Sequence, residues 1–465
     1  MTEVAEPTSI AVRPARVRRS PTELPVTFLD RAFVEALVDE RGEPTWLRDD
    51  RLEALGLYGT LEVESNRLYT PYVDLRAADV AGAAPYAVTG TAPAPGAPAH
   101  HQDTAGLIEI REDSVVALSL DADVSAAGVR LLPLAELVRT DERFARGLLE
   151  RGSILPADEK LAQLSRAAWS QGIVLHVPKD VHVAKPIVLR WAAGAARALV
   201  GRTLIVLEDG AEASVVEELV ASDAAVPGVQ GLLSATTEIR LGAHARLAMA
   251  SLQELGPDHV VFQQRLARIG EGADLRWALA QLGARLVRSR VDNVLAGDRS
   301  TVEQVEIVFG AEDQLHDLTS YTRHVGRDTT GQLLAKGVLL DKARSYMKGL
   351  ISIEKTAIGT DSYLGEFGMN LSRAARAVAI PSLEIDQPDC RRAAHSSSVG
   401  PIDENQLFYL ESRGIAPDEA RKFIVLGFLE PVVARVPLED AQDRLREALE
   451  AKWASGSGTG SASAA

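Results

Sequence analysis

The segment RTLIVLEDGAEASVVEE, residues Arg202–Glu218, contains two short runs rich in β-branched residues on either side of an acidic turn. Thr203–Leu207 and Ser214–Glu218 have the composition of strands, and Gly210-Ala211 supplies the turn between them. Three further small turns follow at intervals of 32, 30 and 25 residues, namely Gly242-Ala243, Gly272-Ala273 and Gly297-Asp298. A loose period without helical inserts indicates a solenoid of stacked coils rather than a doubly wound sheet.

Periodicity alone does not separate a β-helix from an open β-sandwich, because both consist of many short strands. The strand-rich sequence extends from Gly172 to about Ile385, which is much longer than a sandwich domain of about 100 residues. This length favours a parallel β-helix, which we predict over residues 169–400.

Helical patterns flank this core, so the expected fold is mainly β with an α-helical region at each end. Residues 26–168 are predicted to form an N-terminal helical or mixed region, in which the Pro- and Ala-rich stretch 91–102 is an exposed loop. Residues 401–453 carry three helical segments and form a C-terminal helical domain. Residues 1–25 and the Ser-, Gly- and Ala-rich residues 454–465 are expected to be a disordered leader and tail.

Composition narrows the class of protein. A formal net charge of −15 over 465 residues argues against a nucleic-acid partner, which would select a basic patch. No apolar run approaches the length of a membrane span, and no secretory signal is visible. The single cysteine excludes an intramolecular disulfide and fits a reducing compartment. We therefore expect a cytoplasmic protein without a membrane span.

The common catalytic motifs are absent from the sequence. No G-x-x-x-x-G-K-[ST] loop is present, so the chain is not expected to hydrolyse ATP itself. No G-x-G-x-x-G or G-x-S-x-G motif appears either, which removes the commonest dinucleotide and hydrolase interpretations. The prediction is that the chain is not an enzyme.

The segment CRRAAHSSSVGPIDENQLFYLESRG, Cys390–Gly414, joins the predicted core to the C-terminal helices. His395 lies in a loop of small polar residues, and a neutral imidazole can ligate iron or zinc. A lone loop histidine is more often a hydrogen-bonding residue. Asp403 is placed to cap a helix that Gly414 ends.

Other candidate ligands are weaker. Arg391 and Arg392 would favour a thiolate at Cys390, but nearby aspartates oppose them, so the thiol is interpreted as a bystander. His316 and His324 lie eight residues apart, which is not a recognisable metal spacing, and are interpreted as residues of polar turns of the solenoid.

The string that begins at His395, HSSSVGPIDENQLFYLESRGI, closely resembles the signature of the SufB/SufD family, in which a histidine loop runs into a D-E-x-x-x-F-Y-L-x-x-R-G-I helix. Further segments resemble the same family in order along the chain, from about Glu43 to Val436. They are EPTWLRDDRLEAL (Glu43–Leu55), WSQGIVLHVPKDVHVAKPI (Trp169–Ile187), Arg202–Glu218, AKGVLLDKARSYMKGLISIEKTAIGTDSY (Ala335–Tyr363) and IPSLEI (Ile380–Ile385).

The resemblance implies a right-handed parallel β-helix between two helical regions. It also implies that SufB and SufD pair through their β-helices, that the C-terminal helices of each dock a SufC ATPase, and that the complex builds iron–sulfur clusters. The implied partners of this chain are therefore a SufB-like paralogue and a SufC-like ATPase.

Ligand chemistry favours the SufD-like role within the family. A cluster scaffold needs about four ligands, chiefly thiolates, and this chain has one cysteine. SufD relatives often place a cysteine two residues before the histidine, where this chain has Ala393. The family's metal-ligand role therefore carries over to His395 only, with the remaining ligands from the SufB-like chain. We expect that this chain alone binds no cofactor tightly. Iron or an iron–sulfur cluster is expected to bind transiently at the shared interface, and the chain is expected to assist the entry of iron there.

Four aromatic residues of the C-terminal helices are candidate partner contacts, Phe408, Tyr409, Phe423 and Phe428. At helical spacing such residues are usually core, but a domain of about 50 residues rarely buries all of them. Three alternatives stay open: a SufB-like scaffold that holds a cluster itself, a β-helix enzyme acting on polysaccharide, and a purely structural subunit in which His395 only packs the interface.

Overall fold

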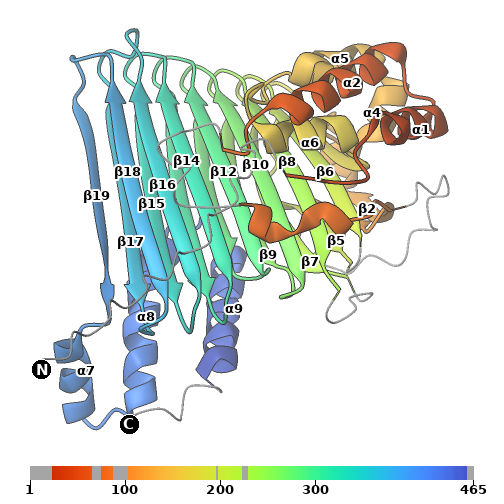
Figure 1. Cartoon of the computed structure of the whole chain (residues 1–465). Coiled ribbons are helices and arrows are strands. Elements are labelled where there is room, and N and C mark those ends of the chain that lie inside the picture. The colour runs from red at the N-terminus through yellow and green to blue at the C-terminus, as the bar shows by residue number, and fades with distance from the viewer. Residues whose placement is uncertain (1–23, 65–74, 87–102, 195–196, 223–228, 458–465) are drawn as a thin grey trace, which may run out of the picture.

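The computed structural model describes residues 24–64, 75–86, 103–194, 197–222 and 229–457. Its core consists of two sheets that face each other and are formed alternately along the chain (Figure 1). From β4 onward every strand pairs in parallel with the strand two positions later, so each coil gives one strand to each sheet. The mainly β fold with a parallel β-helix core and flanking helices is therefore confirmed.

The ten-stranded sheet has the order β19-β17-β15-β13-β11-β9-β7-β5-β1-β2. Its strands are β1 (Gly106–Arg111), β2 (Ser114–Leu120), β5 (Ile187–Ala193), β7 (Glu212–Ala221), β9 (Arg246–Glu254), β11 (Asp274–Gln281), β13 (Thr301–Gly310), β15 (Thr330–Leu339), β17 (Asp361–Asn370) and β19 (Arg392–Pro401).

The nine-stranded sheet has the order β18-β16-β14-β12-β10-β8-β6-β4-β3. Its strands are β3 (Arg130–Pro133), β4 (Gln171–Val177), β6 (Ala198–Leu207), β8 (Gly231–Leu241), β10 (His259–Ile269), β12 (Leu286–Leu295), β14 (Leu315–His324), β16 (Arg344–Ile353) and β18 (Arg376–Ile385). Only β2 and β3, at the N-terminal end, run antiparallel to their neighbours.

The glycine turns of the sequence serve two different purposes. Gly210 and Gly272 adopt φ values of 69° and 61°, in the left-handed region that glycine enters without strain. Gly242 and Gly297 instead allow successive coils to approach, since a Cβ on Gly297 would lie 2.1 Å from the backbone nitrogen of Glu271 in the coil before it. The turns thus set both the corner conformation and the spacing of the coils.

The space between the two sheets, here called the lumen, is filled by side chains from both. A single apolar cluster extends from Ala105 to Val302 and includes Trp191 and Trp277. The outer faces of the sheets are also covered over much of their area, so most strands are buried on both sides. Such strands lack the alternation of a half-exposed sheet.

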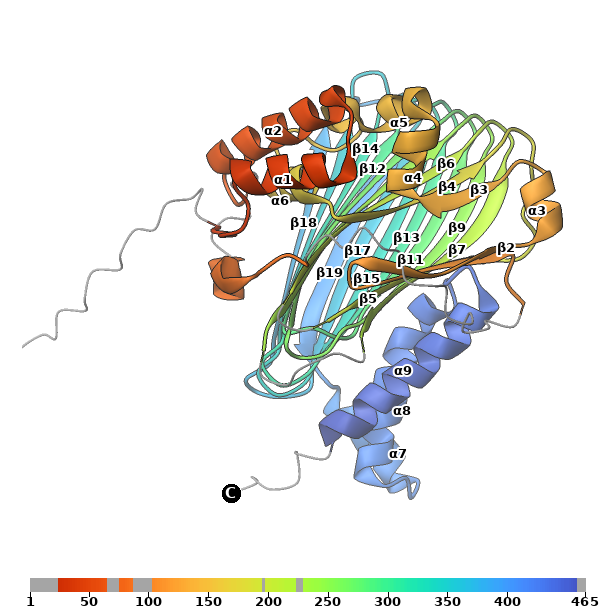
Figure 2. The same ribbon diagram turned by 90° about the vertical axis from the view of Figure 1, so that its right-hand side faces the viewer.

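The N-terminal helices cover the outer face of the nine-stranded sheet (Figure 2). Trp169 is buried at this contact, and the guanidinium of Arg51 lies 4.2 Å from the centre of its ring. The elements of this region are α1 (Arg31–Arg41), α2 (Thr45–Thr60), α3 (Ala122–Ala126), α4 (Leu134–Thr140), α5 (Glu142–Leu149), α6 (Lys160–Ala168) and the 3₁₀ turns η1 (Leu75–Ala78), η2 (Val80–Gly82) and η3 (Glu150–Gly152).

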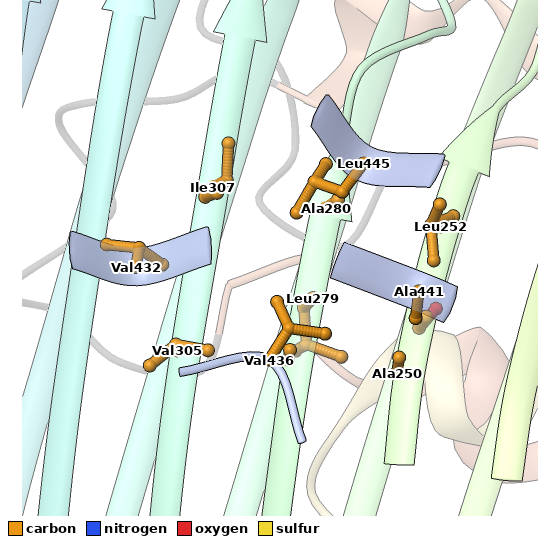
Figure 3. Close-up of a pocket in the computed structure, with 12 residues that line it drawn as sticks. Ala250, Leu252, Leu279, Ala280, Val305, Ile307, Val432, Val436, Ala441 and Leu445 are labelled. Carbon is orange, nitrogen blue, oxygen red and sulfur yellow. The ribbon is translucent and has the colours of Figure 1, made fainter. Parts of the chain in front are cut away.

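The C-terminal helices are α7 (Glu404–Ser412), α8 (Pro417–Val433) and α9 (Glu439–Ser457). The Asp403 side chain caps α7 by accepting from the Asn405 N–H, and Gly414 follows the helix with a φ of 86°. Residues of α8 and α9 pack onto the ten-stranded sheet and leave a small apolar cavity of about 10 Å³ (Figure 3). Val432 and Leu445 face Ile307 and Ala280 there.

Several predicted boundaries differ from the structure. The β-branched run Val181–Leu189 in the sequence predicts a strand, which is wrong in its first half, because β5 begins at Ile187, directly after Pro186. The predicted tail begins at Ala454, whereas α9 continues to Ser457. Residues 1–23 of the leader, the loop 91–102 and residues 458–465 of the tail lie outside the described residues. No helix of the described ranges is both long and apolar enough to cross a membrane.

Candidate functional site

The candidate site is the C-terminal end of the β-helix, here called the open end, which consists of β18 and β19. Within the described chain, each of these ten-residue strands pairs on one side only, β18 with β16 and β19 with β17. Their other edges carry backbone N–H and C=O groups without a neighbouring strand. Figure 1 shows β19 as the last strand of the stack.

His395 lies on β19 and is exposed. The predicted loop at this position is therefore wrong, because residues 392–401 form a complete strand in register with β17. Their small residues have weak strand propensity, and the preceding coil supplies the ladder that holds them. His395 pairs with Leu364, a lumen-facing residue, so its imidazole is on the lumen side at the open end.

Polar contacts fix the strand that carries His395. The Tyr363 and Ser396 hydroxyl oxygens are 2.5 Å apart on the outer face. Arg392 forms an ion pair with Asp361 at 2.7 Å. These contacts hold both sides of His395 while leaving the free edge of β19 accessible.

Cys390 is half-buried in the turn between β18 and β19 and packs against the cluster that contains Ile353 and Leu364. This is the environment of a small apolar residue. In the part of the chain that the structure describes, no three His, Cys, Asp or Glu residues gather into a group that could hold a metal ion. A metal at His395 would need ligands from another chain.

His316 and His324 are not residues of exposed polar turns, because both are buried on β14. Burial lowers the pKa of His316 to about 3 and that of His324 to about 4. The His324 ring nitrogens lie 2.8 Å from Thr329 Oγ1 and 3.0 Å from Ser362 Oγ. Both histidines are therefore neutral structural residues at physiological pH.

The four aromatic candidates divide into two groups. Phe408, Tyr409 and Phe423 are 73%, 57% and 59% exposed on α7 and α8. Phe428 instead belongs to the attachment of α8 to the core: Lys336 Nζ of β15 donates to its carbonyl oxygen at 2.6 Å and lies 4.5 Å from its ring centre. Of the four candidates, Phe408, Tyr409 and Phe423 are therefore the exposed ones.

Sequence reasoning missed two buried carboxyl groups near the open end. Glu306 on β13 and Glu366 on β17 line one cavity in the lumen. Burial raises the pKa of Glu306 to about 7 and that of Glu366 to about 8. The sequence signal that could have identified them is an acidic residue within a strand that is buried on both faces.

Comparison with known proteins agrees with this architecture. The family model described as "SUF system FeS cluster assembly, SufBD core domain" matches residues 190–428, from β5 into α8. This chain belongs to the SufBD family. Membership of the SufBD family makes it an iron–sulfur cluster assembly protein, and the matched region includes both strands of the open end.

Individual SufBD relatives are similar over most of the chain. The iron–sulfur cluster assembly protein SufD of Bacillus subtilis is 28% identical over 344 residues, covering 74% of this chain and 78% of that protein. A SufBD family protein of Staphylococcus epidermidis is 26% identical over 438 residues, covering 90% and 92%. One of Staphylococcus aureus is 25% identical over 435 residues, with the same two shares.

Proposed function

We propose that this chain is the SufD-like, non-catalytic subunit of a SUF-type assembly complex. It pairs with a SufB-like chain through the open end, docks a SufC-like ATPase through its C-terminal helices, and helps iron to reach the shared interface. The observation that carries the proposal is the pair of uncovered ten-residue edges, β18 and β19, with exposed His395 beside them.

The edges favour a protein partner on physical grounds. Long strands with unpaired backbone groups pair readily with another chain, and an internal proline weakens this tendency. β18 contains Pro381, whereas β19 has no proline before its last residue, so β19 is the more favourable edge. Ile385 and Val399 are also exposed here, on β18 and β19 respectively. A second β-helix laid edge to edge would satisfy the backbone groups and bury these side chains.

The donor set favours a shared metal site over a resident one. His395 supplies one nitrogen ligand of the kind that binds iron, and Cys390 is packed as a small apolar residue. An incomplete ligand set at an uncovered edge fits iron that is held only after pairing. SufD is also the name of the Bacillus subtilis relative.

The first experiment co-expresses the chain with SufB-like and SufC-like proteins, with either wild-type His395 or His395→Ala. We expect the variant to assemble the complex normally but to yield markedly less iron and acid-labile sulfide on anaerobic reconstitution. Ser398→Ala, an exposed substitution on the same strand, is the matched control. A normal cluster yield from His395→Ala would leave the residue a purely structural role.

The second experiment tests ATPase docking. Phe408→Ala combined with Phe423→Ala should lower SufC affinity by at least tenfold, because buried aromatic anchors are typically worth about 2 kcal/mol or more at an interface. Leu118→Ala, an exposed apolar substitution on β2, should leave affinity unchanged. Isothermal titration calorimetry measures the affinity for SufC. Equal affinity of the double variant and wild type would exclude this surface as the docking site.

Reconstitution of the isolated chain separates the SufD-like role from a SufB-like scaffold. The SufD-like role predicts that the isolated chain holds no stable, stoichiometric iron and sulfide. One histidine and one half-buried cysteine are too few ligands for a cluster. A stable cluster on the isolated chain would favour the scaffold role.

A further inference from the structure

A column of polar side chains runs along the lumen toward the open end. In-register parallel strands place paired residues on the same face, so lumen-facing residues of successive coils stack. One such column on the ten-stranded sheet is Glu217, Ser251, Leu279, Glu306, Ala335, Glu366 and Ser397. Three of its seven members are carboxylic acids, and Ser397 lies at the open end.

The charges of the lumen do not balance. Among the described residues, the charged side chains on the lumen-facing positions of the strands are Glu217, Glu306, Glu366 and Arg265. Arg265 Nη2 pairs with Glu217 Oε2 at 2.9 Å, and Ser251 Oγ donates to the same oxygen at 2.6 Å. Full ionisation of the two remaining carboxyl groups leaves a local charge of about −2, which is costly in a buried site.

Glu306 and Glu366 face a small cavity of about 10 Å³, close to the space that one water-sized occupant requires. The cavity is also lined by Ser320 and Gln304, by apolar side chains, and by Lys348, whose Nζ pairs with Asp317 Oδ1 at 2.6 Å. Glu306 is 3% exposed, and its Oε1 is buried without a hydrogen-bond partner. Such an orphaned oxygen facing a cavity indicates an occupant that supplies its missing interaction.

The second carboxyl group is held in place. Glu366 Oε2 accepts from the Ile380 N–H of β18 at 3.0 Å. Its Oε1 points toward Gly349, where a Cβ would lie 2.8 Å away. The absence of a side chain at Gly349 therefore leaves room beside this carboxyl group.

We propose that Glu306 and Glu366 form a lumen site for one divalent cation that prefers oxygen ligands, with Mn²⁺ as the representative ion. Two carboxylates neutralise a divalent charge, and the Ser320 hydroxyl, whose oxygen accepts from Gln304 Nε2 at 2.7 Å, is the neutral oxygen group beside them. Glu366 pairs with exposed Ser397, so the site lies one strand from the open end. The site is separate from His395 and does not depend on the proposed function.

The test measures Mn²⁺ binding to the full-length chain after EDTA treatment, by electron paramagnetic resonance of free Mn²⁺ in 0.3 M salt, which suppresses weak surface binding. At pH 8.5 we expect one ion per chain. Glu306→Gln and Glu366→Gln should each weaken binding at least tenfold, because each removes one carboxylate. Lowering the pH to 6.0 should weaken wild-type binding comparably, since protons compete for the same oxygens.

Two controls make the result specific. Glu303→Gln removes a half-buried carboxylate from the same strand, β13, at an outward-facing position, and should bind like wild type. His395→Ala should also retain the ion, which keeps this site distinct from the proposed interface site. Absence of Mn²⁺ binding to the wild-type chain at 1 mM Mn²⁺ would overturn the proposal. This outcome does not depend on whether the variants fold. Unchanged binding in both Gln variants would also overturn it.

Discussion

Buried charges in this protein follow two patterns, which differ in whether a partner is present. Several are paired: Arg202 Nε lies 2.7 Å from Glu238 Oε1, and Arg290 Nη1 lies 2.7 Å from Glu159 Oε2. Burial nonetheless raises the pKa of Glu238. Glu366, in the lumen, has no ion-pair partner among the described residues, and its pKa rises to about 8.

This pattern predicts a pH dependence of stability that Glu366→Gln removes. The carboxyl group ionises near pH 4.5 in the unfolded chain but near pH 8 in the folded one, so the folded state binds more protons between these values. Wild-type stability therefore falls across this interval as pH rises. Glu366→Gln cannot ionise at this position. Between pH 5 and pH 8.5, its free energy of unfolding should therefore rise by roughly 1–4 kcal/mol relative to that of wild type.

Urea unfolding of both proteins in EDTA at several pH values measures this difference. Glu303→Gln is again the control, because its carboxylate lies outside the lumen. Parallel stability profiles for wild type and Glu366→Gln would contradict the prediction.

At the scale of elements, the coil corners are the least tolerant part of the fold. A Cβ on Gly297 would lie 2.1 Å from Glu271 N and 2.4 Å from Gly270 C. These are backbone atoms of the neighbouring coil, which cannot move without separating two coils. Gly427 in α8, by contrast, has no atom within 4 Å of its Cβ position.

Gly297→Ala should therefore destabilise the protein by about 3 kcal/mol or more, in the range of severe overpacking. Gly427→Ala should stabilise it by roughly 0.5–1 kcal/mol, because alanine favours an exposed helix interior. Thermal unfolding followed by circular dichroism compares the two variants. Equal effects of the two substitutions would show that coil spacing is more adaptable than the geometry indicates.

The elements also show what the sequence could and could not predict. The Gly-Ala turns and the β-branched runs were visible, because turn chemistry and strand composition are local. The strand β19 was not, since residues such as Ser396–Ser398 become a strand only through pairing with β17. Glu306 and Glu366 were missed because strands covered on both faces lose the alternation that distinguishes inward from outward residues.

At the scale of the whole molecule, the two helical layers lie on opposite faces of the β-helix (Figure 2). The C-terminal layer is fixed by apolar contacts and by Arg444, which pairs with Glu218 of β7. Burial alone would raise the pKa of Glu218, but Arg444 and Arg190 outweigh it and the pKa is lowered. A force applied to α8 and α9 is therefore transmitted to the strands beneath them.

We expect pairing with a partner chain to be sensitive to mutation at one end of the β-helix and insensitive at the other. Val399→Asp places a charge at the open end, where Val399 is 39% exposed, and should weaken pairing with a SufB-like chain at least tenfold. Leu118→Asp, at a similarly exposed position on β2 of the other end, should leave pairing intact. Analytical ultracentrifugation of the mixed chains measures both, and equal pairing by the two variants would exclude the open end as the interface.

The difference between the ends has a consequence for the size of any assembly. At the N-terminal end the sheets finish in the short antiparallel strands β2 and β3, of seven and four residues, instead of ten-residue parallel strands. Among the described residues, each chain thus offers one pair of ten-residue edges, and the proposed joining of two chains there would use both. In that arrangement growth would stop at a pair of β-helices, which is a closed dimer, and the head-to-tail polymerisation to which stacked β coils are otherwise prone would not follow.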